Sequence, residues 1–233
     1  MVVNLEVINE LDSLYNRAVE LITEQLNKGA STFGLATGGT MLPLYEKIRK
    51  SDLDFSNCIS VNLDEYVGIA RSHPESYRSF MNTQLFEAKP FKQSFLPNGE
   101  ANNVQEEAQN YENILKSLTL DFQLLGIGEN GHIGFNEPGT AFTSETHVVE
   151  LTDSTREANA RFFNSIDEVP KEAITMGIAS IMRAKCIVLI AVGEKKRAAL
   201  EALVYGEVTE DIPVTCLKQH PNVIVLTDLN LSK

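Results

Sequence analysis

Residues 186–205 read CIVLIAVGEKKRAALEALVY, an apolar run that passes through a glycine turn into a helical pattern. An apolar run without alternation predicts a strand that is buried on both faces, as in a parallel sheet covered by helices. The pattern from Glu194 to Tyr205 predicts a helix that follows this strand directly. The pair therefore indicates an α/β fold.

The same alternation of strands and helices continues along the chain in both directions. Helical spacing of apolar residues is clearest at 11–27, where Gly29 follows as a stop signal. There is no repeat, linker or low-complexity stretch, so we expect one α/β, Rossmann-like domain over residues 1–233, with a mostly parallel sheet and helices on both faces. The other predicted strands are 32–36, 59–63, 122–127, 146–151 and 223–226, and the other predicted helices are 76–86, 104–118, 174–184 and one through Tyr45 and Ile48.

The composition excludes several classes of protein. The chain has 233 residues, of which 43% are hydrophobic and 22% charged, and its formal net charge of -12 argues against a nucleic-acid partner. Cys58, Cys186 and Cys216 have no metal-ligand or CxxC spacing and are expected to be free thiols in a reducing compartment. We see no signal peptide, and no apolar run approaches the ~20 residues of a membrane span. We therefore expect a cytoplasmic protein with no membrane partner.

Unusual segments follow several of the predicted strands. In an open parallel sheet, ligands bind beyond the carboxyl ends of the strands, where such segments meet. Four segments are expected at this edge: Thr37–Thr40, Asp64–Gly68, Gly126–Glu137 and the Gly193–Lys196 turn.

The Thr37-Gly38-Gly39-Thr40 segment leaves a strand and opens a helix, which favours an anion site. Glycine lets backbone amides approach an anion closely, and the helix dipole favours negative charge. Lys196 could reach the same anion. The alternatives are a plain tight turn and a solvated lysine, because the segment is neither a Walker loop nor a GxGxxG motif.

Two other segments carry candidates for acid–base chemistry. Asp64 and Glu65 end a buried strand, where a shielded carboxylate could abstract a proton, although a capping or solvated pair is also possible. The loop Gly126–Glu137 is rich in glycine, and a curled path could bring the Glu137 carboxylate to the His132 imidazole. A carboxylate that orients a histidine is typical of general acid–base catalysis.

The chain resembles the glucosamine-6-phosphate deaminase family over nearly its whole length. NLDEYVG followed by GHIGFNEP is the most specific pair of motifs; the related phosphogluconolactonases share the fold and a Gly-His loop but lack the Phe-Asn-Glu-Pro continuation and the Asp-Glu-Tyr strand end. The stretches that carry the resemblance are LATGGT (35–40), NLDEYVG (62–68), HPESY (73–77), GIGENGHIGFNEP (126–138), TREANARFF (155–163) and CLKQHP (216–221).

The resemblance implies a hydrolase of C–N bonds in amino-sugar catabolism. Such an enzyme converts glucosamine 6-phosphate and water to fructose 6-phosphate and ammonia, with no metal or organic cofactor. Asp64 would move the C2 proton to C1, and His132 would open the pyranose ring at O5 with support from Glu137 and Asn130. Asn130 stands where some members carry aspartate, so His132 would depend more on Glu137. The implied substrate and phosphate contacts are Thr37, Gly38, Gly39, Thr40, Arg161 and Lys196.

Two alternative functions fit the same fold. A 6-phosphogluconolactonase-type hydrolase needs no carboxylate base for a C2 proton, so Asp64 disfavours it. A non-catalytic sugar-phosphate sensor usually carries an extra DNA-binding segment, whereas the first predicted helix here begins at Leu11, and the net charge of -12 disfavours DNA.

The sequence also predicts an enzyme that N-acetylglucosamine 6-phosphate does not activate. Larger hexameric members of the family bind N-acetylglucosamine 6-phosphate through basic residues on the strand after the Asn-Glu-Pro loop and through a C-terminal extension. Here His147, Val149 and Glu150 stand where Arg, Lys and Thr are called for, and the chain stops at Lys233. We therefore expect hyperbolic kinetics, no activation by that metabolite, and a monomer.

Overall fold

The main sheet of the molecule is parallel throughout and confirms the predicted α/β class. The computed structural model describes residues 3–160 and 163–231. The sheet has seven strands in the order β1-β10-β9-β6-β2-β3-β5, and all of its neighbouring strands pair in parallel. The bounds are β1 Asn4–Val7, β2 Thr32–Leu35, β3 Ile59–Asn62, β5 Gln93–Phe95, β6 Phe122–Leu125, β9 Cys186–Ala191 and β10 Val223–Thr227.

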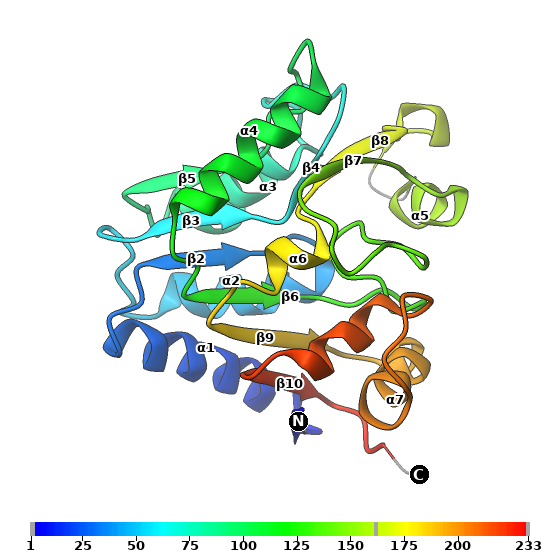
Figure 1. The fold of residues 1–233 in the computed structure, drawn as a ribbon. Helices are drawn as coiled ribbons and strands as arrows, with labels where there is room; N and C mark the ends of the chain where they lie inside the picture. The colour runs from blue at the N-terminus through cyan, green and yellow to red at the C-terminus, as the bar shows by residue number, and fades with distance from the viewer. Residues whose placement is uncertain (1–2, 161–162, 232–233) are drawn as a thin grey trace.

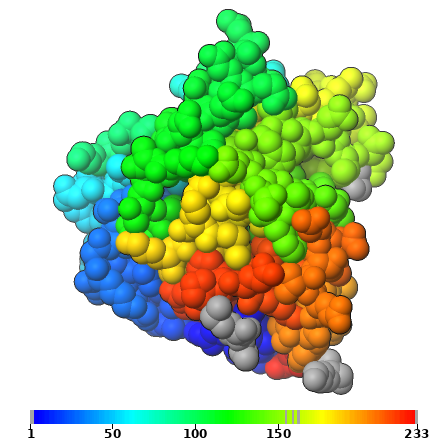
Figure 2. Space-filling model, viewed as in Figure 1, coloured from blue at the N-terminus to red at the C-terminus, as the bar shows by residue number. Residues whose placement is uncertain are grey.

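Helices cover both faces of this sheet, as the sequence predicts. In Figure 1, α4 and α6 cross the near face, whereas α2 lies behind the sheet and packs against α1. In the space-filling view of Figure 2, the green atoms of α4, the yellow atoms of α6 and the red atoms of the C-terminal segment lie side by side over the near face. The bounds are α1 Leu11–Asn27, α2 Leu42–Lys50, α3 Tyr77–Met81, α4 Val104–Ser117, α5 Asp153–Asn159, α6 Ile178–Ile181 and α7 Arg197–Tyr205. The shorter turns are η1 Gly39–Met41, η2 Asn82–Phe86, η4 Ile166–Glu168, η5 Glu194–Lys196 and η6 Pro213–Gln219.

Helix α1 occupies the predicted residues because local signals and burial agree. The Glu10 carboxylate accepts a hydrogen bond from the backbone N–H of Ser13 at 2.9 Å and caps the first turn. Apolar residues at helical spacing then face the sheet. The buried ones are Leu14, Tyr15, Ala18, Leu21 and Ile22.

A second, antiparallel sheet corrects two of the sequence predictions. It has the order β4-β8-β7, with β4 Asp64–Tyr66, β7 His147–Glu150 and β8 Glu172–Thr175. The strand predicted at 146–151 therefore belongs to this small sheet. The helix predicted at 174–184 is wrong at its start, because Ile174 lies between β4 and β7 and is fully buried. Gly177 lies between β8 and α6. Its backbone passes close to that of Ser144, because a Cβ at Gly177 would lie 2.0 Å from the Ser144 carbonyl oxygen.

The small sheet covers a separate cluster of buried side chains. Tyr66, Ile69, Phe135, Leu151 and Ala173 pack together there, outside the core of the main sheet. The three cysteines are free and buried, as expected. No helix within residues 3–160 and 163–231 has both the length and the apolar character that a membrane span requires. The small sheet supports the segments that carry the candidate site.

Candidate active site

Four neighbouring strands of the main sheet bring the four candidate segments to one edge. The order β9-β6-β2-β3 places the carboxyl ends of these strands side by side. Their following segments are the Gly193–Lys196 turn, the Gly126–Glu137 loop, the Thr37–Thr40 turn and Asp64 at the start of β4. The chain proceeds from β2 to β3 on one side and later returns to β6 on the other, so the sheet has its topological switch between β2 and β6. Ligands of open α/β sheets bind at this point.

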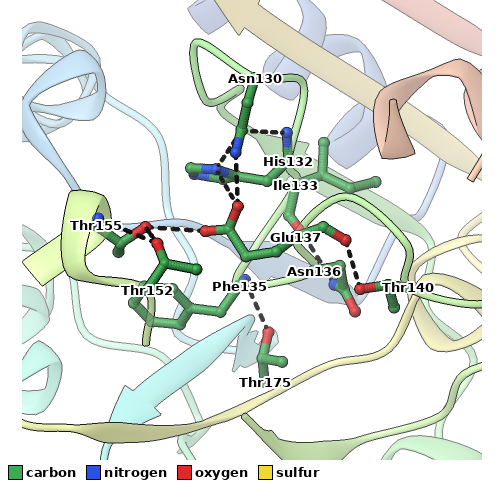
Figure 3. Close-up of polar contacts among 10 residues, drawn as sticks. All are labelled: Asn130, His132, Ile133, Phe135, Asn136, Glu137, Thr140, Thr152, Thr155 and Thr175. Carbon is green, nitrogen blue, oxygen red and sulfur yellow. Dashed lines mark hydrogen bonds and ion pairs between the residues drawn. The ribbon is translucent and has the colours of Figure 1, made fainter. Parts of the chain in front are cut away.

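His132, Asn130 and Glu137 form one hydrogen-bonded group within the loop after β6. The Nδ1 atom of His132 lies 2.8 Å from Asn130 Oδ1 and 3.4 Å from Glu137 Oε2. The Asn130 amide donates to the same Glu137 oxygen at 2.7 Å. Figure 3 shows the three side chains directed toward one another. Because Nδ1 is engaged, the Nε2 atom of His132 is the one left to exchange a proton with a ligand.

Gly128 provides the seat for the His132 ring. A Cβ at Gly128 would lie 2.2 Å from His132 Cε1 and 2.3 Å from Nδ1. The ring therefore lies against the backbone of Gly128, and any side chain there would displace it. The loop holds this arrangement through the Gly128 N–H, which donates to the carbonyl oxygen of His132 at 2.9 Å.

Glu137 is held in its ionised form. Burial alone would raise its pKa, but the hydrogen bond and charge of His132, with hydrogen bonds from Asn130 and Thr155, outweigh burial and lower the pKa to about 2. Thr155 donates to Oε1 at 2.9 Å, on the carboxylate oxygen that does not face Asn130. The ionised Glu137 carboxylate thus lies beside the Nδ1 edge of His132, the arrangement that orients a histidine for general acid–base catalysis.

Asp64 and Glu65 have different surroundings, although both are buried. The Glu65 carboxylate accepts hydrogen bonds from the backbone N–H groups of Tyr66, Tyr77 and Arg78, each at 2.9 Å. Glu65 therefore caps the start of α3. Of the two adjacent carboxylates, only Glu65 has the capping role that the sequence left open for both. Burial raises the pKa of Glu65, against these hydrogen bonds.

Asp64 lies beside the loop that carries His132. A Cβ at Gly134 would lie 3.7 Å from Asp64 Oδ2, so the carboxylate lies close to this glycine. The Asp64 residue is 7% exposed. Burial, followed by the negative charge of Glu65, raises the pKa of Asp64 to about 8. A buried carboxylate with a raised pKa is the type of group that serves as a general base near neutral pH.

Aromatic residues and a threonine that sequence reasoning missed support this part of the site. The rings of Tyr77 and Phe135 stack with their centroids 6.2 Å apart, and the ring centroids of Tyr66 and Tyr77 are 4.7 Å apart. The Thr175 hydroxyl accepts a hydrogen bond from the backbone N–H of Phe135 at 3.1 Å. The HPESY stretch points to Tyr77, but no local pattern marks Thr175, which meets the loop only in the folded chain.

The candidate anion-binding residues lie at the same edge. Gly38 has φ 101° and begins the turn into η1 and α2, and no neighbouring atom lies within 4 Å of a Cβ built on it. The turn is anchored by the Tyr15 hydroxyl, which donates to the carbonyl oxygen of Thr40 at 2.7 Å. Lys196 is half-buried in η5. Arg161, the other predicted phosphate contact, lies outside the described residues.

No group of three or more His, Cys, Asp or Glu side chains that could hold a metal ion occurs in the described part of the chain. The polar groups of the site are instead an acid–base set, formed by Asp64, Asn130, His132 and Glu137, and an open turn rich in glycine. Such a set can move protons on a bound anion.

Comparisons with known proteins show the family of this chain. The family model for glucosamine-6-phosphate isomerases/6-phosphogluconolactonase matches residues 9–225. A glucosamine-6-phosphate deaminase of Lysinibacillus sphaericus is 64% identical over 208 residues, which cover 89% of this chain and 94% of the relative. The solved structure of a monomeric glucosamine-6-phosphate deaminase has a TM-score of 0.93 at 41% identity and 96% coverage of both chains. A 6-phosphogluconolactonase of Thermotoga maritima, 15% identical with a TM-score of 0.77 over 96% of this chain and 98% of its own, shares the fold alone.

Proposed function

This chain belongs to the family of glucosamine-6-phosphate isomerases and 6-phosphogluconolactonases, and we propose from that membership and from its site that it acts as a glucosamine-6-phosphate deaminase. The enzyme converts glucosamine 6-phosphate and water to fructose 6-phosphate and ammonia. The observation that carries this function is the buried Asp64 carboxylate beside the loop of His132. Isomerisation with loss of an amine needs two separate proton-transfer groups, whereas lactone hydrolysis needs no base for a carbon-bound proton.

Ring opening is the first step that we assign to the site. As the C1–O5 bond breaks, His132 donates a proton from Nε2 to O5, and the O1 hydroxyl passes its proton to solvent water, so that a free aldehyde forms. Glu137 stabilises the protonated imidazole, and Asn130 holds its Nδ1 edge.

Proton transfer between C2 and C1 is the second step. The aldehyde withdraws electrons and acidifies the C2 proton, which the Asp64 carboxylate removes while O1 takes up a proton from solvent water, to leave an enolamine. Asp64 then returns the proton to C1, and water hydrolyses the resulting imine at C2 to release ammonia. Because burial favours the protonated carboxyl of Asp64, the positively charged amine of the substrate would help to ionise it.

The phosphate supplies binding energy away from the reacting carbons. The glycine turn at Gly38 and Gly39 and the side chain of Lys196 are the proposed contacts from the described residues, together with Thr37 and Thr40. They follow β2 and β9, on either side of β6, and would gather positive charge and amides locally in an acidic protein. Remote contacts of this kind hold the reacting atoms in place.

Ammonia release from glucosamine 6-phosphate tests the function directly. We expect the wild type to release ammonia and form fructose 6-phosphate, and Asp64→Asn to lose this activity by on the order of 10²- to 10⁴-fold because its amide cannot accept the C2 proton. Calorimetric titration should show that the variant still binds the substrate. Hydrolysis of 6-phosphogluconolactone without ammonia release would favour the hydrolase instead, and binding without turnover would favour a sensor.

We also propose that the enzyme is a cytoplasmic monomer without activation by N-acetylglucosamine 6-phosphate. The 41% identical deaminase is described as monomeric, and the free buried cysteines suit a reducing compartment. On β7, Val149 packs against the cluster under the small sheet, and Glu150 is exposed and would repel an anion. Light scattering should give the mass of one chain. Sigmoidal rate curves that become hyperbolic with the metabolite would contradict the proposal.

A further inference from the structure

Glu137 is bonded on its second oxygen to a helix that lies outside its own loop. The Thr155 hydroxyl, in the first turn of α5, donates to Glu137 Oε1 at 2.9 Å. The Thr152 hydroxyl lies 2.9 Å from that of Thr155 and also accepts from the Thr155 backbone N–H at 3.2 Å. Figure 3 shows Thr155 beside the carboxylate oxygen that does not face Asn130, with Thr152 bonded to Thr155.

The direction of these hydrogen bonds follows from the charge of Glu137. An ionised carboxylate only accepts hydrogen bonds, so the single hydroxyl proton of Thr155 must point to Oε1. The Thr155 oxygen can then only accept from Thr152, and Thr152 is the residue that caps α5. The capped end of α5 is thus linked through two hydroxyls to the carboxylate beside His132.

The two carboxylate oxygens have separate partners. Oε2 faces Asn130 and His132, whereas Oε1 is held by Thr155. Without a donor on Oε1, the carboxylate could rotate and lose its alignment with the His132 ring. Water could replace the hydrogen bond, since the Glu137 side chain is 19% exposed, but it would not fix the carboxylate in one orientation.

We propose that Thr155 is a positioning residue for ring opening, which holds Oε2 of Glu137 against Asn130 and His132 through its own hydrogen bond to Oε1. This inference rests on the proposed function for its kinetic consequence. His132 is needed only while the substrate is cyclic, whereas the C2 proton is transferred by Asp64. The loss of Thr155 should therefore impair ring opening and spare the later steps.

Thr155→Val, which removes the hydroxyl and keeps the shape, tests the proposal. We expect its kcat on glucosamine 6-phosphate to fall about tenfold with KM nearly unchanged. Activity on a 5-O-methyl analogue, which cannot close the pyranose ring, should be retained. Thr155→Ser should restore the wild-type ratio of the two activities.

Thr140→Val is the matched control. The Thr140 hydroxyl also bonds Glu137, but it donates to the backbone carbonyl oxygen at 2.7 Å and not to the carboxylate. This variant should leave the ratio of activities unchanged. An equal loss on both substrates in Thr155→Val, or a ratio that Thr155→Ser does not restore, would overturn the proposal.

A second measurement does not depend on the enzymatic activity. The pKa of the Glu137 carboxyl, followed by carbon NMR, should rise by roughly half a unit to one unit in Thr155→Val, because a hydrogen bond to the ionised form is lost. It should not change in Thr155→Ser or Thr140→Val. An unchanged pKa in Thr155→Val would overturn the positioning role even if the wild type proved to have another activity.

Discussion

Asp64 lies directly opposite Thr175 in the antiparallel pair of β4 and β8. The Thr175 hydroxyl in turn accepts the backbone N–H of Phe135, which lies in the loop of His132. One residue of β8 thus connects the candidate base to the loop that carries the candidate acid. Both proton-transfer groups are positioned by the small sheet, although the loop and Asp64 follow different strands of the main sheet.

The pH dependence of the free enzyme should report Asp64. Because burial raises its pKa to about 8, the carboxylate that removes the C2 proton becomes more abundant as the pH increases toward that value. We expect kcat/KM for glucosamine 6-phosphate to rise between pH 6 and about 8. A flat profile over this range would indicate a base with the ordinary pKa of a carboxyl group.

Asp64→Asn should stabilise the folded protein, to an extent that depends on pH. The pKa of Asp64 is about 8 when folded, against an ordinary value of 3.8 for an aspartate carboxyl. The stability associated with its protonated form is therefore complete below the unfolded pKa and is lost as the pH rises toward the folded one. Urea unfolding should show equal stability of the two proteins near pH 4 and a variant more stable by on the order of a few kcal/mol at pH 8. If the difference in unfolding free energy between the variant and the wild type were the same at pH 4 and pH 8, the raised pKa of Asp64 would be contradicted.

His132→Gln should be more harmful with a cyclic substrate than with an open-chain one. Only the cyclic form needs a proton delivered to O5, so we expect a loss on the order of 10²-fold or more for glucosamine 6-phosphate and a small loss for the 5-O-methyl analogue. His147→Gln, on β7, is the control and should leave both rates unchanged. Equal losses on both substrates in His132→Gln would assign that residue a structural role.

Gly128→Ala should displace the His132 ring, because the new Cβ would lie within 2.5 Å of three ring atoms. We expect a loss of deaminase activity of about 10²-fold. Gly126→Ala is the matched control in the same loop, since its Cβ would meet only the end of the flexible Met41 side chain at 3.5 Å. Similar activities in the two variants would show that the ring does not depend on the glycine.

Lys196→Met should weaken substrate binding and spare turnover at saturation. Loss of a charged hydrogen bond to the phosphate should raise KM by about tenfold to a hundredfold. Inorganic phosphate should compete with the substrate in the wild type and less in the variant. Lys195→Met is the control, because the neighbouring Lys195 forms an exposed ion pair with Glu129 at 3.4 Å. If glucosamine without phosphate bound as tightly as the substrate, the assignment of these residues to an anion site would be wrong.

Local patterns predicted five of the seven strands of the main sheet, but not the edge strands β1 and β5, and they predicted the edge at which the candidate segments meet. An apolar run such as 186–192 can be buried on both faces only in a covered sheet, and the following glycine turn predicts where its ligand edge lies. The sequence predicts helix α1 with its observed bounds because the apolar spacing lies within the helix and the stop signal lies directly beside it. The family motifs likewise identified His132, Glu137 and Asp64 as candidates before their geometry was known.

Only the tertiary structure distinguished between residues whose local sequence is equivalent. Asp64 and Glu65 are adjacent carboxylates, yet Glu65 is occupied by backbone N–H groups of residues 77 and 78, whereas Asp64 lies close to Gly134. Ile174 and Thr175, the last two residues of β8, fall in a helix predicted from the sequence, because the burial of β8 comes from β4 and β7, which lie far away along the chain. The stretch TREANARFF begins at Thr155, but nothing in it indicates the hydrogen bond of Thr155 to Glu137, since the two residues are 18 positions apart. Hydrogen bonds and burial between distant segments depend on how the chain folds back on itself, and a periodicity over a few neighbouring residues does not contain that information.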